Sequence, residues 1–240
     1  MPRKQVLHPD LWHFESFRLG QAAFAEAKAL ANSRQPLAVV TAEAGQGKTF
    51  NAEYFANANP DTRIAVCPPR EILTARSLLS AIAQATGLHD QPYQTGRLFE
   101  RLVSHLIAVK SFVILDEADR LTASLADLLR ELAEQADTAI CFLGCPGLLS
   151  TLSRVAATHH RIGFAFSIPP VGEQDITQAL KDFTTETVAE IYNQTRGNIR
   201  HLEALLKQVS RLRSRGDQKP VVTPTIIRRL AGQFLLKGAA

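Results

Sequence analysis

The chain has 240 residues, 45% of them hydrophobic, and its 27 Lys and Arg against 23 Asp and Glu give a net charge of +4 and a pI near 9.1. This length allows one large domain or two small ones whose hydrophobic cores need no disulfides. No apolar run approaches the roughly 18 residues of a membrane span, and the first residues lack a signal-peptide core, so a cytoplasmic protein without membrane contact is expected. The odd set Cys67, Cys141 and Cys145 predicts reduced, packed thiols.

The first part of the chain alternates between apolar runs and amphipathic segments. A first helix is expected to end near Ser33, and residues 12–18 are interpreted as an aromatic strap that precedes it. Five strands are then expected, at residues 37–40, 62–68, 112–116, 137–145 and 161–170. Their apolar runs are nearly continuous, which is typical of a parallel sheet covered by helices on both faces. The sequence therefore predicts a three-layer α/β domain.

The sequence changes character near Pro170. Beyond it, four short helices are expected and no strand of comparable strength. Residues 1–170 hold 16 basic and 16 acidic side chains, whereas residues 171–240 hold 11 basic and 7 acidic ones, so the second part carries the whole net charge. We predict an N-terminal strap and first helix (1–34), an α/β core (35–170) and a small basic helical domain (171–240).

The first expected strand leads into the sequence Ala42-Glu-Ala-Gly45-Gln-Gly47-Lys48-Thr49. It matches the phosphate-loop pattern G-x-x-x-x-G-K-[ST] except that Ala42 replaces the first glycine, which requires a negative φ there. In this pattern backbone amides and a helix N-terminus surround phosphates, the lysine reaches the β and γ oxygens, and the hydroxyl binds Mg²⁺. The residues expected at the nucleotide are Ala44, Gly45, Gln46, Gly47, Lys48, Thr49 and Phe50.

The third expected strand ends in two adjacent carboxylates, Asp116 and Glu117. Asp116 at the strand tip is placed to hold Mg²⁺, and Glu117 is placed to polarise an attacking water. Adjacent acids at a strand end also occur as ordinary turn and helix-capping residues. Together with the phosphate loop, however, this motif predicts a site for ATP and Mg²⁺.

These motifs, with the segments HHRIGFAFSIPP and GNIRHLEALL, resemble those of the AAA+ ATPases. Within that family the chain is most similar to the branch of phage Mu transposition protein B and transposon target-selection ATPases. The resemblance implies strand order 5-1-4-3-2, a helical lid after the sheet, and nucleotide bound between the subunits of a ring or helical filament.

The resemblance also implies roles for particular arginines. Arg161 matches the arginine finger, which reaches the γ-phosphate of a neighbouring subunit, and Arg154 is the alternative. Arg200 matches the arginine of the second sensor motif, which touches the nucleotide. Where the family has a polar first sensor, this chain has Gly144 and Cys145. Cysteine is a weak hydrogen-bonding group, so slow hydrolysis is expected.

Candidate DNA contacts are basic and lie in both parts of the chain; they are Arg70, Arg76, Arg97, Arg101, His105, Lys207, Arg211, Arg213, Arg215 and Lys219. They could equally be solvated helix ends. No base-reading motif is visible, so binding to double-stranded DNA would be led by the backbone, independent of sequence and sensitive to salt. The sequence favours an ATP-dependent protein that oligomerises on DNA, selects transposition targets and activates a transposase. The alternatives are a nucleotide-switched ATPase of a protein assembly, of the secretion type, and a helicase-loader-like ATPase.

Overall fold

The computed structural model describes residues 14–214 and 221–234. The chain divides into two compact units. One, here called the sheet unit, comprises residues 20–42 and 48–168, and the other, the helical unit, comprises residues 1–19, 43–47 and 169–240. Each is described by itself below, and the domain limits expected from the sequence stay a prediction.

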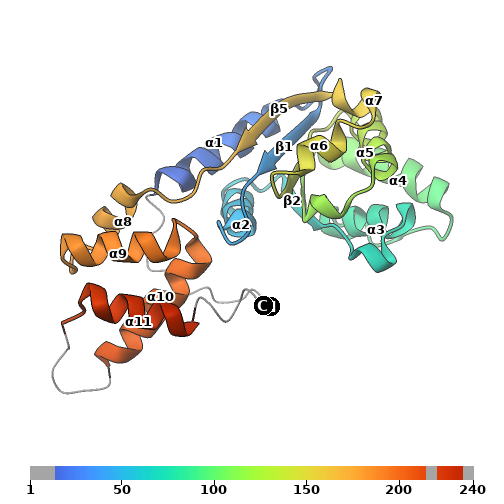
Figure 1. Ribbon diagram of the computed structural model, residues 1–240. Helices are drawn as coiled ribbons and strands as arrows, with labels where there is room; N and C mark the ends of the chain where they lie inside the picture. Colours follow the sequence, from blue (N-terminus) through green and yellow to red (C-terminus); the bar gives the residue numbers. More distant parts are fainter. Residues whose placement is uncertain (1–13, 215–220, 235–240) are drawn as a thin grey trace. The chain divides into compact units, whose positions relative to one another are not determined.

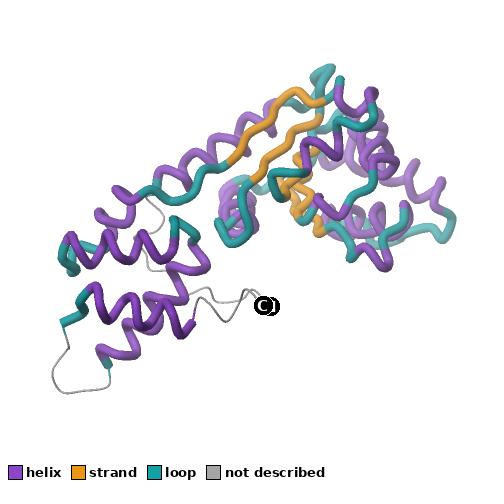
Figure 2. The backbone as a smooth tube through the Cα atoms, viewed as in Figure 1, coloured by secondary structure: helices purple, strands orange, loops and turns teal. Residues whose placement is uncertain are grey.

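The sheet unit is built on five parallel strands. They are β1 (Leu37–Thr41), β2 (Thr62–Val66), β3 (Phe112–Asp116), β4 (Ile140–Gly144) and β5 (Ile162–Ser167). The strand order is β2-β3-β4-β1-β5, and every pairing is parallel (Figure 1). This confirms the expected order 5-1-4-3-2. Figure 2 marks the strands against the helices that connect them.

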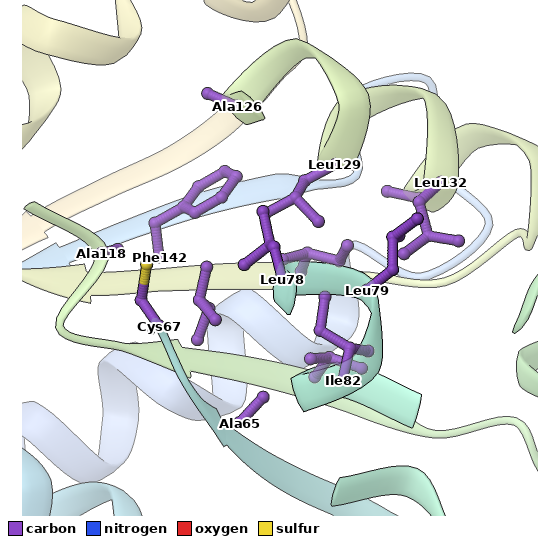
Figure 3. Packing of buried hydrophobic residues seen from close by; sticks show 14 of the residues in the cluster. Ala65, Cys67, Leu78, Leu79, Ile82, Ala118, Ala126, Leu129, Leu132 and Phe142 are labelled. Carbon is purple, nitrogen blue, oxygen red and sulfur yellow. The ribbon is translucent and has the colours of Figure 1, made fainter. Parts of the chain in front are cut away.

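Helices pack on both faces of the sheet, as expected. The connecting elements are α1 (Glu15–Ala29, which begins in the helical unit), α2 (Lys48–Ala58), η2 (Arg70–Ile72), α3 (Ala75–Thr86), α4 (Thr95–Val109), η3 (Ala118–Arg120), α5 (Ala123–Gln135), α6 (Leu148–Leu152) and α7 (Ala156–His159). Side chains of α3, α4 and α5 pack with one set of strand residues, and those of α1 and α2 with the alternate set. Figure 3 shows the first core, to which α3 contributes Leu78, Leu79 and Ile82, α5 contributes Leu129 and Leu132, and β4 contributes Phe142.

Three details differ from the sequence-based expectation. The inner strands β1, β3 and β4 are buried throughout, but β5 alternates between half-buried and exposed residues and β2 is partly exposed, because an edge strand has a neighbour on one side only. The sequence of residues 69–87 predicts one helix, but α3 begins only at Ala75 because Thr74 caps it through a reciprocal bond with Ser77. The segment between β4 and β5 forms two short helices, α6 and α7, rather than one.

The helical unit contains the four expected helices. They are α8 (Glu173–Ala179), α9 (Thr185–Thr195), α10 (Ile199–Arg213) and α11 (Pro224–Phe234). Thr184 and Asn198 cap the N-termini of α9 and α10 through their side chains. The core of the unit is aliphatic and includes Ile176, Val188, Ile191, Leu202, Leu205, Val209 and Ile227.

Candidate nucleotide site

The phosphate loop has the backbone that its glycines require. Gly45 and Gly47 have φ values of 83° and 74°, and Ala42 is not among the residues with positive φ. Alanine therefore replaces the first glycine of the pattern without strain. Within the loop, the Glu43 amide donates to Gln46 Oε1 at 3.1 Å.

The first turn of α2 meets the tip of β3 inside the sheet unit. The Thr49 hydroxyl donates to Asp116 Oδ2 at 2.7 Å, although 67 residues separate them in the sequence. Asp116 is only 4% exposed, and its other oxygen accepts the Glu117 amide at 2.8 Å. A hydroxyl and a carboxylate at this distance form the hard oxygen donor set that Mg²⁺ prefers, so these two residues fit the ion.

Lys48 opens the same helix. Its Nζ donates to Ala42 O at 2.7 Å and lies 3.7 Å from Cys145 Sγ at the end of β4. Phe50 follows in the same turn and is half-buried. The lysine is therefore held over the carboxyl end of β1, which is where a phosphate-binding lysine belongs in this class of loop.

Glu117 directly follows the strand and adopts a left-handed backbone, with φ of 58°. Its Oε2 lies 3.4 Å from Arg120 Nη2, and about half of its side chain (47%) is exposed. The Asp116 carboxylate is instead buried and held by Thr49. The two adjacent acids therefore have different surroundings.

The tip of β4 is shaped by Asp119, which sequence reasoning did not single out. Its Oδ1 accepts the Cys145 amide at 3.2 Å, and a Cβ at Gly144 would lie only 2.8 Å from the same oxygen. Glycine is needed at 144 because Asp119 approaches so closely. The signal that could have revealed this residue was the third acid of the sequence DEAD.

All three cysteines are free, in agreement with the expectation. Burial raises the pKa of the Cys67 thiol to about 11. It also raises the pKa of Cys141, which lies wholly inside the sheet. Both are neutral packing residues near pH 7.

The two candidate arginine fingers have different surroundings. The Arg161 guanidinium forms an ion pair with Glu134 of α5, and Glu134 also pairs with Arg130 at 2.6 Å. Arg154 is exposed, and its guanidinium forms no ion pair with any residue that the structure describes. Arg161 thus has an ion-pair partner on its own chain, whereas Arg154 has none among the described residues.

Arg200, the candidate sensor, lies in the helical unit together with the phosphate loop. Its side chain is exposed, and its amide donates to Gly45 O at 3.0 Å. The N-terminal aromatic residues of the expected strap also belong to this unit: Phe14 and Phe17 are buried, whereas Trp12 lies outside the described residues. Helix α1 begins against α8, where the Glu15 amide donates to both Asp175 oxygens at 3.3 Å.

Most of the basic residues expected at DNA in the sheet unit have partners of their own. Arg70 donates to Asp119 O and Arg76 to Pro92 O, both at 2.8 Å. Arg101 pairs with Asp90 at 2.7 Å, and His105 Nε2 lies 2.9 Å from Thr86 O. Of the three candidate DNA contacts on α4, this leaves Arg97, which is exposed.

In the helical unit the basic side chains are more available. Lys207 and Arg211 are exposed, Arg213 lies over the Phe183 ring at 4.4 Å, and Arg215 and Lys219 fall outside the described residues. Sequence reasoning missed Arg228 and Arg229 of α11, which are also exposed, although Arg228 pairs with Glu190 at 3.1 Å. Their adjacency on an amphipathic helix was the available signal.

None of the helices in the described ranges 14–214 and 221–234 is both long enough and apolar enough to cross a bilayer.

The fold and these motifs define a P-loop nucleotide-binding protein. Residues 31–152 match the family model described as AAA domain, which is more than half of the chain. The chain belongs to this family, so the resemblance to the AAA+ ATPases is confirmed.

Similar proteins of bacteria and phages support the branch as well. A protein named potential ATP-binding protein from Staphylococcus aureus is 32% identical over 114 residues, which cover 42% of each chain. The ATP-dependent target DNA activator B of Escherichia phage D108 is 30% identical over 114 residues, covering 48% of this chain and 36% of the phage protein. The match therefore spans less than half of either relative. The resemblance to the branch of Mu transposition protein B is confirmed.

A solved structure shares the fold at low sequence identity. The crystal structure of Cdc6p from Pyrobaculum aerophilum superposes with a TM-score of 0.71 at 17% identity, over 96% of this chain and 69% of that one. At this identity the likeness concerns the fold alone.

Proposed function

We propose that this protein binds and slowly hydrolyses ATP with Mg²⁺, oligomerises on double-stranded DNA without sequence preference, and acts in the cytoplasm as the target-selection protein and activator of a transposase. The observation that carries the nucleotide site is the 2.7 Å hydrogen bond between the Thr49 hydroxyl and Asp116. It joins the phosphate-loop threonine to the strand-tip acid, the pair that P-loop proteins use for Mg²⁺. The transposition role is supported by the names of the relatives.

Each site residue has a proposed task. Residues 44–50 bind the phosphates, with Lys48 supplying positive charge and the backbone amides supplying hydrogen bonds. Thr49 and Asp116 would hold Mg²⁺, which neutralises phosphate charge when bound. Glu117 takes a proton from the attacking water, and Arg200 touches the nucleotide.

The arginine finger is supplied by a neighbouring subunit in this proposal. Arg161 and Arg154 are the two candidates, and the pairing of Arg161 with Glu134 favours Arg154. The weak polarity of Gly144 and Cys145 at the tip of β4 supports slow hydrolysis, below about one turnover per second without a partner.

The first experiment separates binding from hydrolysis. Lys48→Ala should lose binding of a slowly hydrolysed ATP analogue, whereas Glu117→Gln should bind it normally and lose about 100-fold to 10,000-fold in hydrolysis. Glu100→Gln is the matched control, because Glu100 is an exposed acid on α4. Normal hydrolysis by Glu117→Gln would remove the proposed base, and no Mg²⁺-dependent binding by the wild type would remove the nucleotide function.

The second arm of that experiment tests DNA. The analogue-bound protein should assemble on duplex DNA at low salt and dissociate as salt rises. If nucleotide binds but no DNA binding occurs at low salt, the transposition role is wrong. The secretion-type and helicase-loader-like alternatives then take its place.

A further inference from the structure

Asn198 stands at a tightly fixed turn between α9 and α10 in the helical unit. Arg196 and Gly197 both have positive φ, at 52° and 70°. A Cβ at Gly197 would collide with the Val171 carbonyl, and the Val171 amide donates to Gly197 O at 3.2 Å. Glycine and this backbone bond hold the turn in one position, so the next side chain is presented in a defined direction.

The Asn198 side chain uses both ends of its amide group. Its Oδ1 accepts the His201 amide at 3.2 Å and so caps α10. Its Nδ2 donates to Ala44 O in the phosphate loop at 2.7 Å. The cap uses only the acceptor, so the donor is available for a second task.

A second bond fixes the next peptide group of the same loop. The Arg200 amide donates to Gly45 O at 3.0 Å. The two segments are also closely packed, because a Cβ at Gly45 would lie 2.5 Å from Asn198 Oδ1 and one at Gly47 would lie 3.1 Å from Ile199 Cδ1. Two consecutive loop carbonyls are therefore held from the beginning of α10.

Holding these carbonyls also orients the loop amides. A trans peptide group is planar, and its C=O and N–H point in opposite directions. The Ala44 C=O and the Gly45 N–H belong to the same peptide group, so when Ala44 O points at Asn198, the Gly45 N–H points away from Asn198. In the same way, the bond to Gly45 O fixes the direction of the Gln46 N–H. Amides of this kind form the anion-binding concavity of a phosphate loop.

We propose that Asn198 is a positioning residue that sets the phosphate-binding amides of the loop, and that nucleotide binding and the packing of the α10 N-terminus on the loop stabilise each other. This coupling is reciprocal, because whatever favours the packed arrangement also favours the nucleotide. The inference rests on the proposed nucleotide function and adds a residue that does not itself touch the nucleotide.

Three variants of the full chain separate the bond to the loop from the helix cap. Asn198→Ser keeps a capping oxygen but is too short to reach Ala44 O, and Asn198→Ala loses both bonds. Thr184→Ala is the control, because it removes the corresponding cap of α9 and leaves the loop untouched. Affinity for a slowly hydrolysed ATP analogue is measured by titration, and thermal unfolding by circular dichroism.

Asn198→Ser should bind the analogue roughly threefold to tenfold more weakly than the wild type with nearly unchanged unfolding, as expected for one lost hydrogen bond. Asn198→Ala should show the same loss of affinity and a lower Tm, and Thr184→Ala should show only the lower Tm. If the wild type binds the analogue and Asn198→Ser binds it equally well, the positioning role is wrong while the nucleotide function stands. If the wild type itself does not bind, the proposed function has failed instead.

Discussion

The two units of this protein use their cations differently. In the sheet unit, arginines hold the chain together: Arg76 donates to Pro92 O, Arg120 donates to Cys67 O at 2.6 Å, and Arg130 pairs with three acids of its own helix. In the helical unit, Arg200, Lys207 and Arg229 are exposed and form no ion pairs within the described part of the chain.

This difference bears on where the net positive charge lies and on which part of it is free to bind an anion. Residues 171–240 carry the whole excess of four positive charges. Among the described residues there, Arg200, Lys207 and Arg229 are exposed without an ion pair, whereas Arg228 pairs with Glu190 at 3.1 Å. The sheet unit also contains arginines, but most of their guanidinium groups have partners within the unit. A count of basic residues therefore overstates the DNA-binding potential of the sheet unit.

The largest expected effect is on ATP hydrolysis, and it tests whether the arginine finger is the unpaired Arg154 or the paired Arg161. Arg154→Ala should bind ATP but lose roughly 1,000-fold in hydrolysis, because a finger stabilises transition-state charge in a neighbouring subunit. Mixing this variant with Lys48→Ala subunits, whose own sites are dead but whose Arg154 is intact, should restore hydrolysis. Steady-state ATPase assays at several mixing ratios measure both effects.

The matched variant is Arg161→Ala, which breaks the pair with Glu134. It should lower stability and retain most of the hydrolysis. The reverse pattern, with Arg161→Ala inactive and rescued by mixing, would return the finger to Arg161.

The fold was predictable because its signals are local and strong. The apolar runs of β1, β3 and β4 are buried throughout, as continuous runs suggest, and Thr184, Asn198 and Gly87 mark helix ends by known capping chemistry. The weaker burial of β5 depends on its position at the edge of the sheet. The strand order sets that position, and the apolar pattern of a single strand does not reveal the strand order.

The motif residues of the site were predictable from the sequence, but the contacts between them were not. The sequence indicated Thr49 and Asp116 separately, and the parallel arrangement of β1, β4 and β3 brings them to hydrogen-bonding distance. The partners of Arg161 and His105 could not be predicted, because Glu134 and Thr86 lie on other elements and their approach depends on packing. Asn198 was visible as part of the sensor motif, but its bond to Ala44 O requires the folded loop.

A medium effect is expected when a paired arginine of the sheet unit is removed. Arg130 is only 14% exposed and pairs with Asp127, Glu131 and Glu134. Arg130→Met keeps the packing of the stem but leaves the acids without their cation, so we expect a loss of about 2 kcal/mol in the free energy of unfolding, measured with urea. Arg97→Met, an exposed arginine of the same unit, should change it by less than about 0.5 kcal/mol.

The same network sets a pH dependence. Arg130 holds the pKa of Asp127 below its ordinary value, with a smaller contribution from Thr158. Since the carboxylate is favoured in the folded state, its contribution is present above the unfolded pKa of about 3.9 and is lost as the pH falls through the folded pKa. The stability difference between wild type and Arg130→Met should therefore shrink in acid; a difference that persists there would assign the effect to packing.

The smallest effect concerns the salt dependence of DNA binding and tests the helical unit directly. Arg211 and Arg229 are exposed on α10 and α11, which pack against each other. Each cation that neutralises a DNA phosphate releases counterions and adds about 0.9 to the slope of log K against log salt concentration. Arg211→Ala with Arg229→Ala should therefore lower the slope by about two, measured by fluorescence anisotropy on duplexes of unrelated sequence.

Arg97→Ala provides the control from the sheet unit, since Arg97, unlike Arg101 and His105 of the same helix, has neither an ion pair nor a side-chain hydrogen bond among the described residues. An unchanged slope in this variant, together with a reduced slope in the double variant, assigns the phosphate contacts to the helical unit. The opposite result would mean that the exposure of basic side chains does not predict the DNA contacts and that DNA binds along α4. Because the slope counts neutralised phosphates rather than affinity, it separates the two surfaces even when either substitution weakens binding only slightly.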